Sequence, residues 1–137
     1  MVRGFAVRTL GEIPSVQQEH ADAPEWKPLQ HHFRIRAFGL NVFTAPTAGA
    51  VLVAPHDERR SGQQELYLVL EGDVTFILDG EEFEATAGTV VAVPDSGVRR
   101  EAVARSAGAR ILAVGARPGG GFRSTWSPHW FADVPQF

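Results

Sequence analysis

The stretch Glu65-Leu-Tyr-Leu-Val-Leu-Glu-Gly-Asp-Val-Thr-Phe-Ile-Leu-Asp-Gly80 decides the fold, because turn residues separate two short apolar runs. Residues 66–70 and 74–78 are rich in the aliphatic and aromatic residues that favour strands. Asp79-Gly80 tolerates the positive φ angles that a type I′ hairpin turn requires. Gly72 predicts a second tight hairpin, which would join the two runs. The stretch as a whole therefore predicts antiparallel β-structure.

The rest of the chain repeats this pattern of short apolar runs between glycines and prolines. Further strands are predicted at residues 32–44, 50–54, 82–85, 89–93, 98–104 and 110–114. About eight strands with short connections indicate an all-β fold, an antiparallel β-sandwich or jelly-roll barrel. We expect one domain over residues 1–137, with its core at about 40–115, an N-terminal arm at 1–30 and an aromatic tail at 116–137.

Composition excludes several classes of function. The chain has 137 residues and a net charge of −3, so it offers no strongly basic surface to nucleic acid. It has no cysteine, which excludes disulfides, thiolate metal sites and cysteine nucleophiles. No apolar run approaches the ~18 residues of a membrane span, and residues 1–8 do not resemble a signal peptide. We expect a cytoplasmic protein with no membrane partner.

Two fragments of the core resemble the motifs of the cupin superfamily. Residues 65–72 fit the E-x(6)-G half of the first cupin motif, and residues 88–94 fit the G-x(5)-P half of the second. They occur in the right order and at the right separation, and the resemblance covers roughly residues 50–115. It implies the cupin barrel. In typical members it also implies an Fe, Mn, Ni or Zn ion held by two His and a Glu from the first motif and a His from the second.

The positions that would hold this ion depart from the cupin pattern. Arg100 stands where the second motif has its His, and a guanidinium has no lone pair to offer a metal. In the first motif, His56 and Glu58 take the two His positions only if the loop before Glu65 is longer than usual. We therefore expect no metal cofactor. The alternative is one divalent transition metal (Fe, Mn, Ni or Zn) on His56, Glu58 and Glu65.

Glu65 and Arg100 leave two interpretations open, because the resemblance points both side chains into the barrel. A lone buried carboxylate is costly, so Arg100 could neutralise Glu65 in an ion pair that occupies the metal position. Alternatively, Arg100, with Arg99 at the rim, could bind the carboxylate or phosphate of a small ligand. Tyr67 shares the parity of Glu65 and would either be a core residue or orient that ligand. His56 completes the candidate ligand-binding set.

Predictions also follow for the residues that line this cavity and for the C-terminal tail. Apolar side chains are expected to line the cavity: Phe76, Leu78, Val90 and Ala92. The aromatic tail should pack on the barrel flank or on a second subunit, and contributes Trp126, Trp130, Phe131 and Phe137.

Three functions follow from these observations. The first is a small-molecule-binding or regulatory barrel for a small anionic or polar organic molecule, without a functional transition metal and most simply a homodimer. The alternative is a metal-dependent cupin enzyme of the dioxygenase, isomerase or cyclase type with an atypical His/Glu site. A purely structural homodimer is the third. Fold analogy alone does not choose among them.

Overall fold

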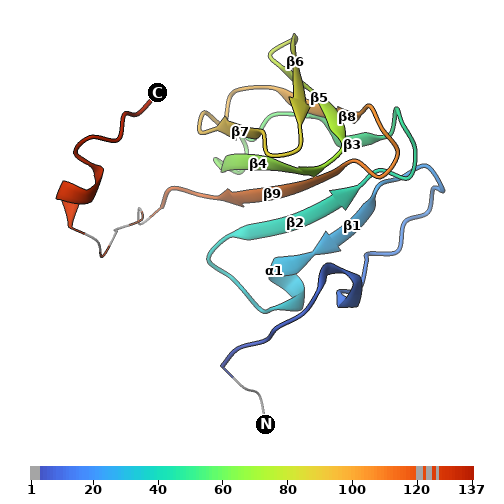
Figure 1. Cartoon of the computed structure of the whole chain (residues 1–137), viewed down its shortest axis with the longest axis horizontal. Helices are drawn as coiled ribbons and strands as arrows, with labels where there is room; N and C mark the ends of the chain where they lie inside the picture. Colours follow the sequence, from blue (N-terminus) through green and yellow to red (C-terminus); the bar gives the residue numbers. More distant parts are fainter. Residues whose placement is uncertain (1–3, 120–121, 123–124, 126) are drawn as a thin grey trace.

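The computed structural model describes residues 4–119, 122, 125 and 127–137, and its strands form two sheets (Figure 1). The elements along the chain are η1 (Leu10–Glu12), β1 (Glu25–Pro28), α1 (Leu29–His32), β2 (Gly39–Thr44), β3 (Val51–His56), β4 (Gln64–Glu71), β5 (Asp73–Leu78), β6 (Glu81–Thr86), β7 (Val90–Val93), β8 (Arg100–Ala104), β9 (Arg110–Ala116) and η2 (Pro128–Phe131).

The two sheets are antiparallel throughout. One has the strand order β1-β2-β9-β4-β7 and the other the order β3-β8-β5-β6. Buried apolar side chains from both sheets fill the space between them, among them Val69 and Ile111 from the first and Val74 and Phe76 from the second. This arrangement confirms the predicted all-β sandwich. Among the described residues, no helix has the length and apolar character needed to cross a membrane.

The hairpin predicted at Asp79-Gly80 is confirmed. The φ angles of Asp79 and Gly80 are +51° and +85°, as a type I′ turn requires. The turn joins β5 to β6, with Leu78 opposite Glu81 in the ladder.

The hairpin predicted at Gly72 is wrong, because β4 and β5 belong to different sheets. Residues 71–73 instead carry the chain from one sheet to the other. Gly72 has a φ of +73°, and a Cβ there would lie 2.6 Å from Ser106 Oγ and 2.9 Å from the Cα of Ala109. Both conformation and space therefore require glycine. A glycine in a turn indicates that the chain changes direction there. It does not indicate whether the two flanking strands pair with each other.

The continuous strand predicted at residues 32–44 is also wrong. The strand β2 begins only at Gly39, and the one-turn helix α1 precedes it. Leu29 and Phe33 lie four residues apart, the spacing of one helical face, and both pack in a cluster with Val42. The alternation of apolar residues after His32 was misleading because Phe33 packs, partly buried, at the end of a helical turn and not in a strand.

The end of α1 explains why the strand does not start earlier. The amide of Ile35 donates to Gln30 O at 2.8 Å, and that of Arg34 donates to His31 O at 3.3 Å. Arg34 has a φ of +60°, so this pattern closes the helix as a Schellman motif.

The N-terminal arm is part of the sandwich. It contributes β1, which pairs with β2 and was not predicted as a strand. Ile13 of the arm is buried with Leu29 and Val42 against the outer face of the five-stranded sheet. The ammonium of Lys27 fixes the arm by donating to the carbonyl oxygen of Leu10 at 2.5 Å.

The C-terminal tail leaves the sandwich after β9, and η2 lies apart from both sheets (Figure 1). Trp130 and Phe137 are 66% and 105% exposed. The described part of the tail therefore does not cover the barrel flank with these side chains. Trp126 lies outside the described residues.

Candidate functional site

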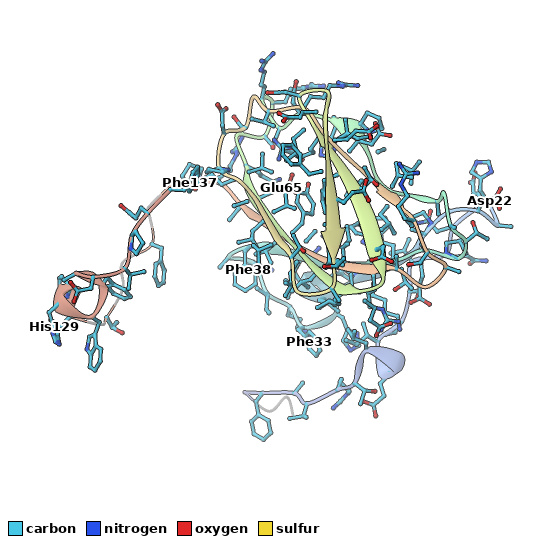
Figure 2. All side chains as sticks on the ribbon, turned by 45° about the horizontal axis from the view of Figure 1, so that its top comes forward. Asp22, Phe33, Phe38, Glu65, His129 and Phe137 are labelled. Carbon is cyan, nitrogen blue, oxygen red and sulfur yellow. The ribbon has the colours of Figure 1, made fainter. Side chains whose placement is uncertain are left out.

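Glu65 and Arg100 meet between the two sheets. Glu65 lies on β4 of the five-stranded sheet and Arg100 at the start of β8 in the other sheet. Glu65 is seen within the sandwich in Figure 2. Arg100 Nη1 donates to Glu65 Oε1 at 2.7 Å, and the Arg100 side chain has no exposed surface. The structure thus contains the ion pair that the first interpretation of these residues expected.

Glycine opposite Glu65 makes room for its side chain. Gly115 of β9 is the ladder partner of Glu65, and a Cβ there would lie 3.2 Å from Glu65 Cγ and 2.7 Å from Gln63 Oε1. Gly115 was not predicted to be part of the site. The only signal was an isolated glycine within a strand pattern, which is typical of a close approach by another group.

Backbone carbonyls accept three further hydrogen bonds from the Arg100 guanidinium. Arg100 Nε and Nη2 donate to the carbonyl oxygen of Val98 at 3.2 and 2.8 Å, and Nη2 also reaches Asp95 O at 3.4 Å. These carbonyls belong to the loop between β7 and β8. Arg100 therefore holds both this loop and the Glu65 side chain in place.

Tyr67 adds a neutral donor to the same carboxylate. Its hydroxyl donates to Glu65 Oε1 at 3.0 Å, and the residue is 2% exposed. Its ring packs against Phe76 with ring centroids 5.5 Å apart. Burial raises the pKa of the Tyr67 hydroxyl, and the negative charge of Glu65 raises it further. The phenol therefore remains protonated and serves as a hydrogen-bond donor in the core.

His56 lies at the mouth of the sandwich, where the cluster reaches solvent. Its Nδ1 donates to Ala54 O at 2.7 Å, and its Nε2 lies 2.9 Å from Glu58 Oε1 and 3.9 Å from Glu65 Oε1. The side chains of His56 and Glu58 are 38% and 18% exposed. Both ring nitrogens face acceptor oxygens. With Glu58 ionised, only the doubly protonated ring makes both hydrogen bonds.

The loop at residues 57–63 brings Glu58 to His56. The amide of Glu58 donates to Ser96 O at 2.9 Å, which ties this loop to the loop before Arg100. Ser61 Oγ donates to Glu58 Oε2 at 2.5 Å, so both carboxylate oxygens have partners. This is the loop whose length decided whether His56 faces inward. Ser61 was not predicted, and no sequence signal marked it.

Three side chains place potential metal-ligand atoms close enough together to bind one ion. One ligand atom from each of His56, Glu58 and Glu65 lies within 4.8 Å of the other two. Glu65 Oε1, however, already accepts hydrogen bonds from Arg100 and Tyr67, which use both of its lone pairs. The guanidinium of Arg100 also compensates the charge of Glu65. As arranged, the Glu65 carboxylate fits the guanidinium of Arg100 better than a divalent ion.

The structure does not bring Arg99 into this cluster. Arg99 immediately precedes β8 and is exposed, whereas Arg100 is buried. Its amide instead donates to Asp79 Oδ1 at 2.8 Å and supports the β5–β6 turn.

The parity predicted for Val90 and Ala92 is wrong. Both residues are exposed, whereas Val93 is buried and Val91 packs on the core. Val91 and Val93 are the ladder partners of Tyr67 and Glu65, so they share the inward face. The predicted wall residues Phe76 and Leu78 do belong to the core.

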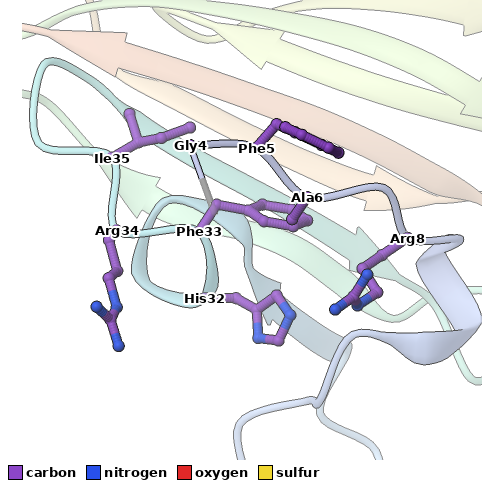
Figure 3. Close-up of a pocket in the computed structure, with 8 residues that line it drawn as sticks. All are labelled: Gly4, Phe5, Ala6, Arg8, His32, Phe33, Arg34 and Ile35. Atoms are coloured by element: carbon purple, nitrogen blue, oxygen red, sulfur yellow. The ribbon is translucent and has the colours of Figure 1, made fainter. Parts of the chain in front are cut away.

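Two hollows on the surface lie away from this cluster. One, of about 900 Å³, lies between the N-terminal arm and residues 32–35, where Phe5, Arg8 and Phe33 are among its walls (Figure 3). The other, of about 390 Å³, is bordered by Pro24 and Arg110, among others. Neither is lined by a residue of the Glu65 cluster.

Comparison with solved structures identifies the fold. A sugar phosphate isomerase of the cupin superfamily from Silicibacter pomeroyi aligns with a TM-score of 0.67 and 21% identity, over 82% of this chain and 76% of its own. A predicted oxalate decarboxylase from Thermotoga maritima aligns with 0.66 and 21%, over 82% and 99%. A cupin protein from Bacteroides fragilis aligns with 0.61 and 20%, over 89% and 96%.

These similarities concern the fold alone, because all three identities are below 25%. The descriptions of the neighbours also name different activities, an isomerase and a decarboxylase. No protein-family model matches the chain, and no curated protein does.

Proposed function

Because the chain has the cupin fold, we propose that it is a small-molecule-binding barrel that works without a transition metal. Arg100 takes the position that a metal-binding His has in the cupin pattern. The observation that carries the proposal is the 2.7 Å contact between Arg100 Nη1 and Glu65 Oε1. A protein cation neutralises the carboxylate, so the site needs no ion for charge balance.

The ligand binds at the mouth of the barrel in this proposal. His56 is the most exposed member of the cluster, and Glu58 is partly exposed beside it. Arg59 is exposed on the same loop and lies over Gly97, where a Cβ would be 3.3 Å from Arg59 Nε. A small polar or anionic organic molecule would meet His56 and Arg59 there. Arg100 acts as a positioning residue that holds Glu65 and the 94–99 loop.

Metal content and one substitution test the proposal. The purified chain should contain far less than one Fe, Mn, Ni or Zn per molecule, and added Zn²⁺ should not raise its melting temperature. Arg100→His removes the cation and supplies an imidazole, so Zn²⁺ should stabilise that variant. Arg99→His is the matched control, because its side chain is exposed and lies outside the cluster. A stoichiometric metal in the unmodified protein would refute the proposal.

Ligand binding is tested separately from the metal. A panel of small carboxylates and organic phosphates should include members that raise the melting temperature, and His56→Ala should abolish that rise. His129→Ala is the control, because His129 lies in the exposed tail. A rise that survives in His56→Ala would place the ligand elsewhere.

The alternative function is a metal-dependent cupin enzyme, and the convergence of His56, Glu58 and Glu65 favours it. The Nδ1 contact of His56 with Ala54 O also resembles the backbone contact that orients metal-bound histidines. Against it stands the use of Glu65 Oε1 by Arg100 and Tyr67. The same metal measurement separates the two functions, because the enzyme requires an ion in the unmodified chain.

A further inference from the structure

The hollow between the N-terminal arm and residues 32–35, which we call the arm hollow, has the size and the apolar walls of a small-molecule site. Its volume is about 900 Å³, and pockets for small organic molecules measure roughly 300–1,000 Å³. Phe5 comes from the arm, and Phe33 and Ile35 come from the end of α1 and the residues after it (Figure 3). Two aromatic side chains from separate segments of the sequence therefore border one hollow.

The polar part of the wall is cationic. Arg8 of the arm and Arg34 after α1 line the arm hollow together with His32, and none of the described residues that line it is acidic. The sequence explains this imbalance, because residues 1–11 and 26–56 contain no aspartate or glutamate although the whole chain has a net charge of −3. An anion in the arm hollow would therefore meet two guanidinium groups and no like charge from these walls.

The backbone holds Arg34 in an unfavourable conformation while its side chain stays available. In the described part of the chain, the exposed Arg34 guanidinium makes no hydrogen bond and no ion pair. Its φ of +60° is the left-handed conformation that a helix end normally gives to glycine. A side chain costs stability at such a position, and contacts of the guanidinium within the described residues offset none of that cost. A role in binding accounts for an arginine here.

The other two polar residues of the wall are suited to the same role. Arg8 Nη1 donates to Val7 O at 2.7 Å, which uses one of the five N–H groups of the guanidinium. The ring of His32 lies edge-on to that of Phe33, with ring centroids 4.9 Å apart and an angle of 75° between the planes. This contact fixes the two rings relative to each other on one wall of the arm hollow.

We propose that the arm hollow binds a small organic anion made of an aromatic ring and a carboxylate or phosphate group. The ring packs against Phe5 and Phe33, and the anionic group accepts hydrogen bonds from Arg8 and Arg34. The planar guanidinium matches the geometry of both kinds of anion. The arm hollow is separate from the barrel mouth at His56, so the inference is independent of the proposed function.

A small anion fits the arm hollow better than a nucleic acid, which carries the same rings and charges. A long polyanion needs a basic surface that follows its backbone, and the net charge of the whole chain is −3. A small ligand meets only the local excess of arginine around the hollow.

The first test is the binding of 1-naphthoate and 1-naphthyl phosphate to the full chain, followed by the fluorescence anisotropy of the naphthalene ring. At least one of them should bind about tenfold or more tightly than neutral 1-naphthalenemethanol, and the difference should shrink at about 0.5 M salt. Inorganic phosphate, which lacks the ring, should compete only weakly. Binding of the charged and neutral probes with equal affinity would overturn the inference, and so would no binding of either anion.

Matched variants locate the bound probe. Arg8→Gln and Arg34→Gln should each weaken the binding of the anionic probe about tenfold. The control for both is Arg36→Gln, because Arg36 is exposed on the same segment and does not line the arm hollow. Phe5→Ala should weaken the binding of charged and neutral naphthyl probes alike, about fivefold, through lost ring contact. Its control is Phe122→Ala, because Phe122 is 93% exposed and lies outside the hollow.

Arg34→Gly separates a binding role of Arg34 from a structural one. Glycine accepts a φ of +60°, so the melting temperature should stay the same or rise, while the affinity for the anionic probe falls as in Arg34→Gln. A lower melting temperature would show that the guanidinium supports the fold, and would overturn its assignment as a binding group. An affinity that is unchanged in both Arg8→Gln and Arg34→Gln would place the anion elsewhere and overturn the inference as a whole.

Discussion

Strand β4 carries a glutamate near each end, and each pairs with an arginine in different surroundings. Glu65 meets Arg100 across the sandwich at 2.7 Å, where the two side chains are 13% and 0% exposed. Glu71 meets Arg110 within its own sheet at 3.4 Å, where they are 62% and 26% exposed. The chemical groups are the same, so the comparison isolates burial. A buried ion is costly if left alone, whereas an exposed ion is solvated with or without its partner.

The largest effect should come from removing the buried cation. Arg100→Met leaves Glu65 without its charge partner inside the sandwich, so the free energy of unfolding should fall by about 3–5 kcal/mol. Part of that loss comes from the carbonyls of Val98 and Asp95, which lose their donor. Urea unfolding measures the change. A loss below about 1 kcal/mol, the range of exposed pairs, would show that water reaches Glu65 freely.

Removing both members of the buried pair should restore part of the loss. Glu65→Leu combined with Arg100→Met leaves no uncompensated charge, and apolar side chains often replace a buried ion pair without cost. We expect the double variant to be about 2 kcal/mol more stable than Arg100→Met alone. Glu65→Leu alone completes the double-mutant cycle. If the double variant is the least stable of the three, Arg100 matters mainly through the 94–99 loop.

The sequence predicted the interior of the fold well where local patterns decide it. The alternation in residues 65–69 placed Tyr67 inside, and Asp79-Gly80 identified its turn. Prediction from the sequence failed where contacts between distant segments determine the local structure. Gly72 looks like a hairpin turn until the sheet of each flanking strand is known. Leu29 and Phe33 form a helical turn because Val42 offers them a surface to pack on.

The candidate site divides in the same way. The Glu65–Arg100 contact followed from a resemblance that points both side chains into the barrel and from the cost of a lone buried charge; the two strands that carry them lie in different sheets. The partner of His56 could not be fixed, because the loop at residues 57–63 has no regular period. Its fold depends on the contact between Glu58 N and Ser96 O, a residue far away in the sequence.

The pH dependence of stability that Tyr67 causes tests how far water is excluded from the buried end of β4. Burial raises the pKa of its hydroxyl above the ordinary value of about 10, so the folded chain holds this proton after the unfolded chain has lost it. The contribution to stability is therefore complete below pH ~10 and falls by up to about 1.4 kcal/mol per pH unit above it.

Tyr67 is the only tyrosine, so phenolate absorbance reports this one group. We expect no phenolate signal from the native chain at pH ~10, and its appearance only together with unfolding. If the folded chain instead forms the phenolate with the ordinary tyrosine pKa of about 10, water reaches the Tyr67 hydroxyl and this end of β4 is not desolvated.

A smaller effect should follow from Tyr67→Phe. The variant keeps the ring contact with Phe76 and removes only the 3.0 Å hydrogen bond to Glu65 Oε1. Arg100 still neutralises the carboxylate, so the expected cost is about 1 kcal/mol. The comparison is with Arg100→Met under the same urea conditions. An equal loss in the two variants would mean that the hydroxyl and not the guanidinium compensates Glu65.

The smallest effect should come from the exposed pair at the other end of β4. Glu71→Gln removes one charge from the 3.4 Å contact, and Arg110 keeps its 2.9 Å hydrogen bond to Thr44 Oγ1. We expect a loss of less than about 0.5 kcal/mol, because solvent already screens this pair. At about 1 M salt even this loss should vanish, whereas the cost of Arg100→Met should persist because a buried pair is screened far less. If Glu71→Gln instead costs as much as Arg100→Met at both ionic strengths, burial does not set the strength of these pairs. The Arg100–Glu65 contact would then behave like an exposed ion pair. Its position inside the barrel would give no reason to expect the site to work without a metal.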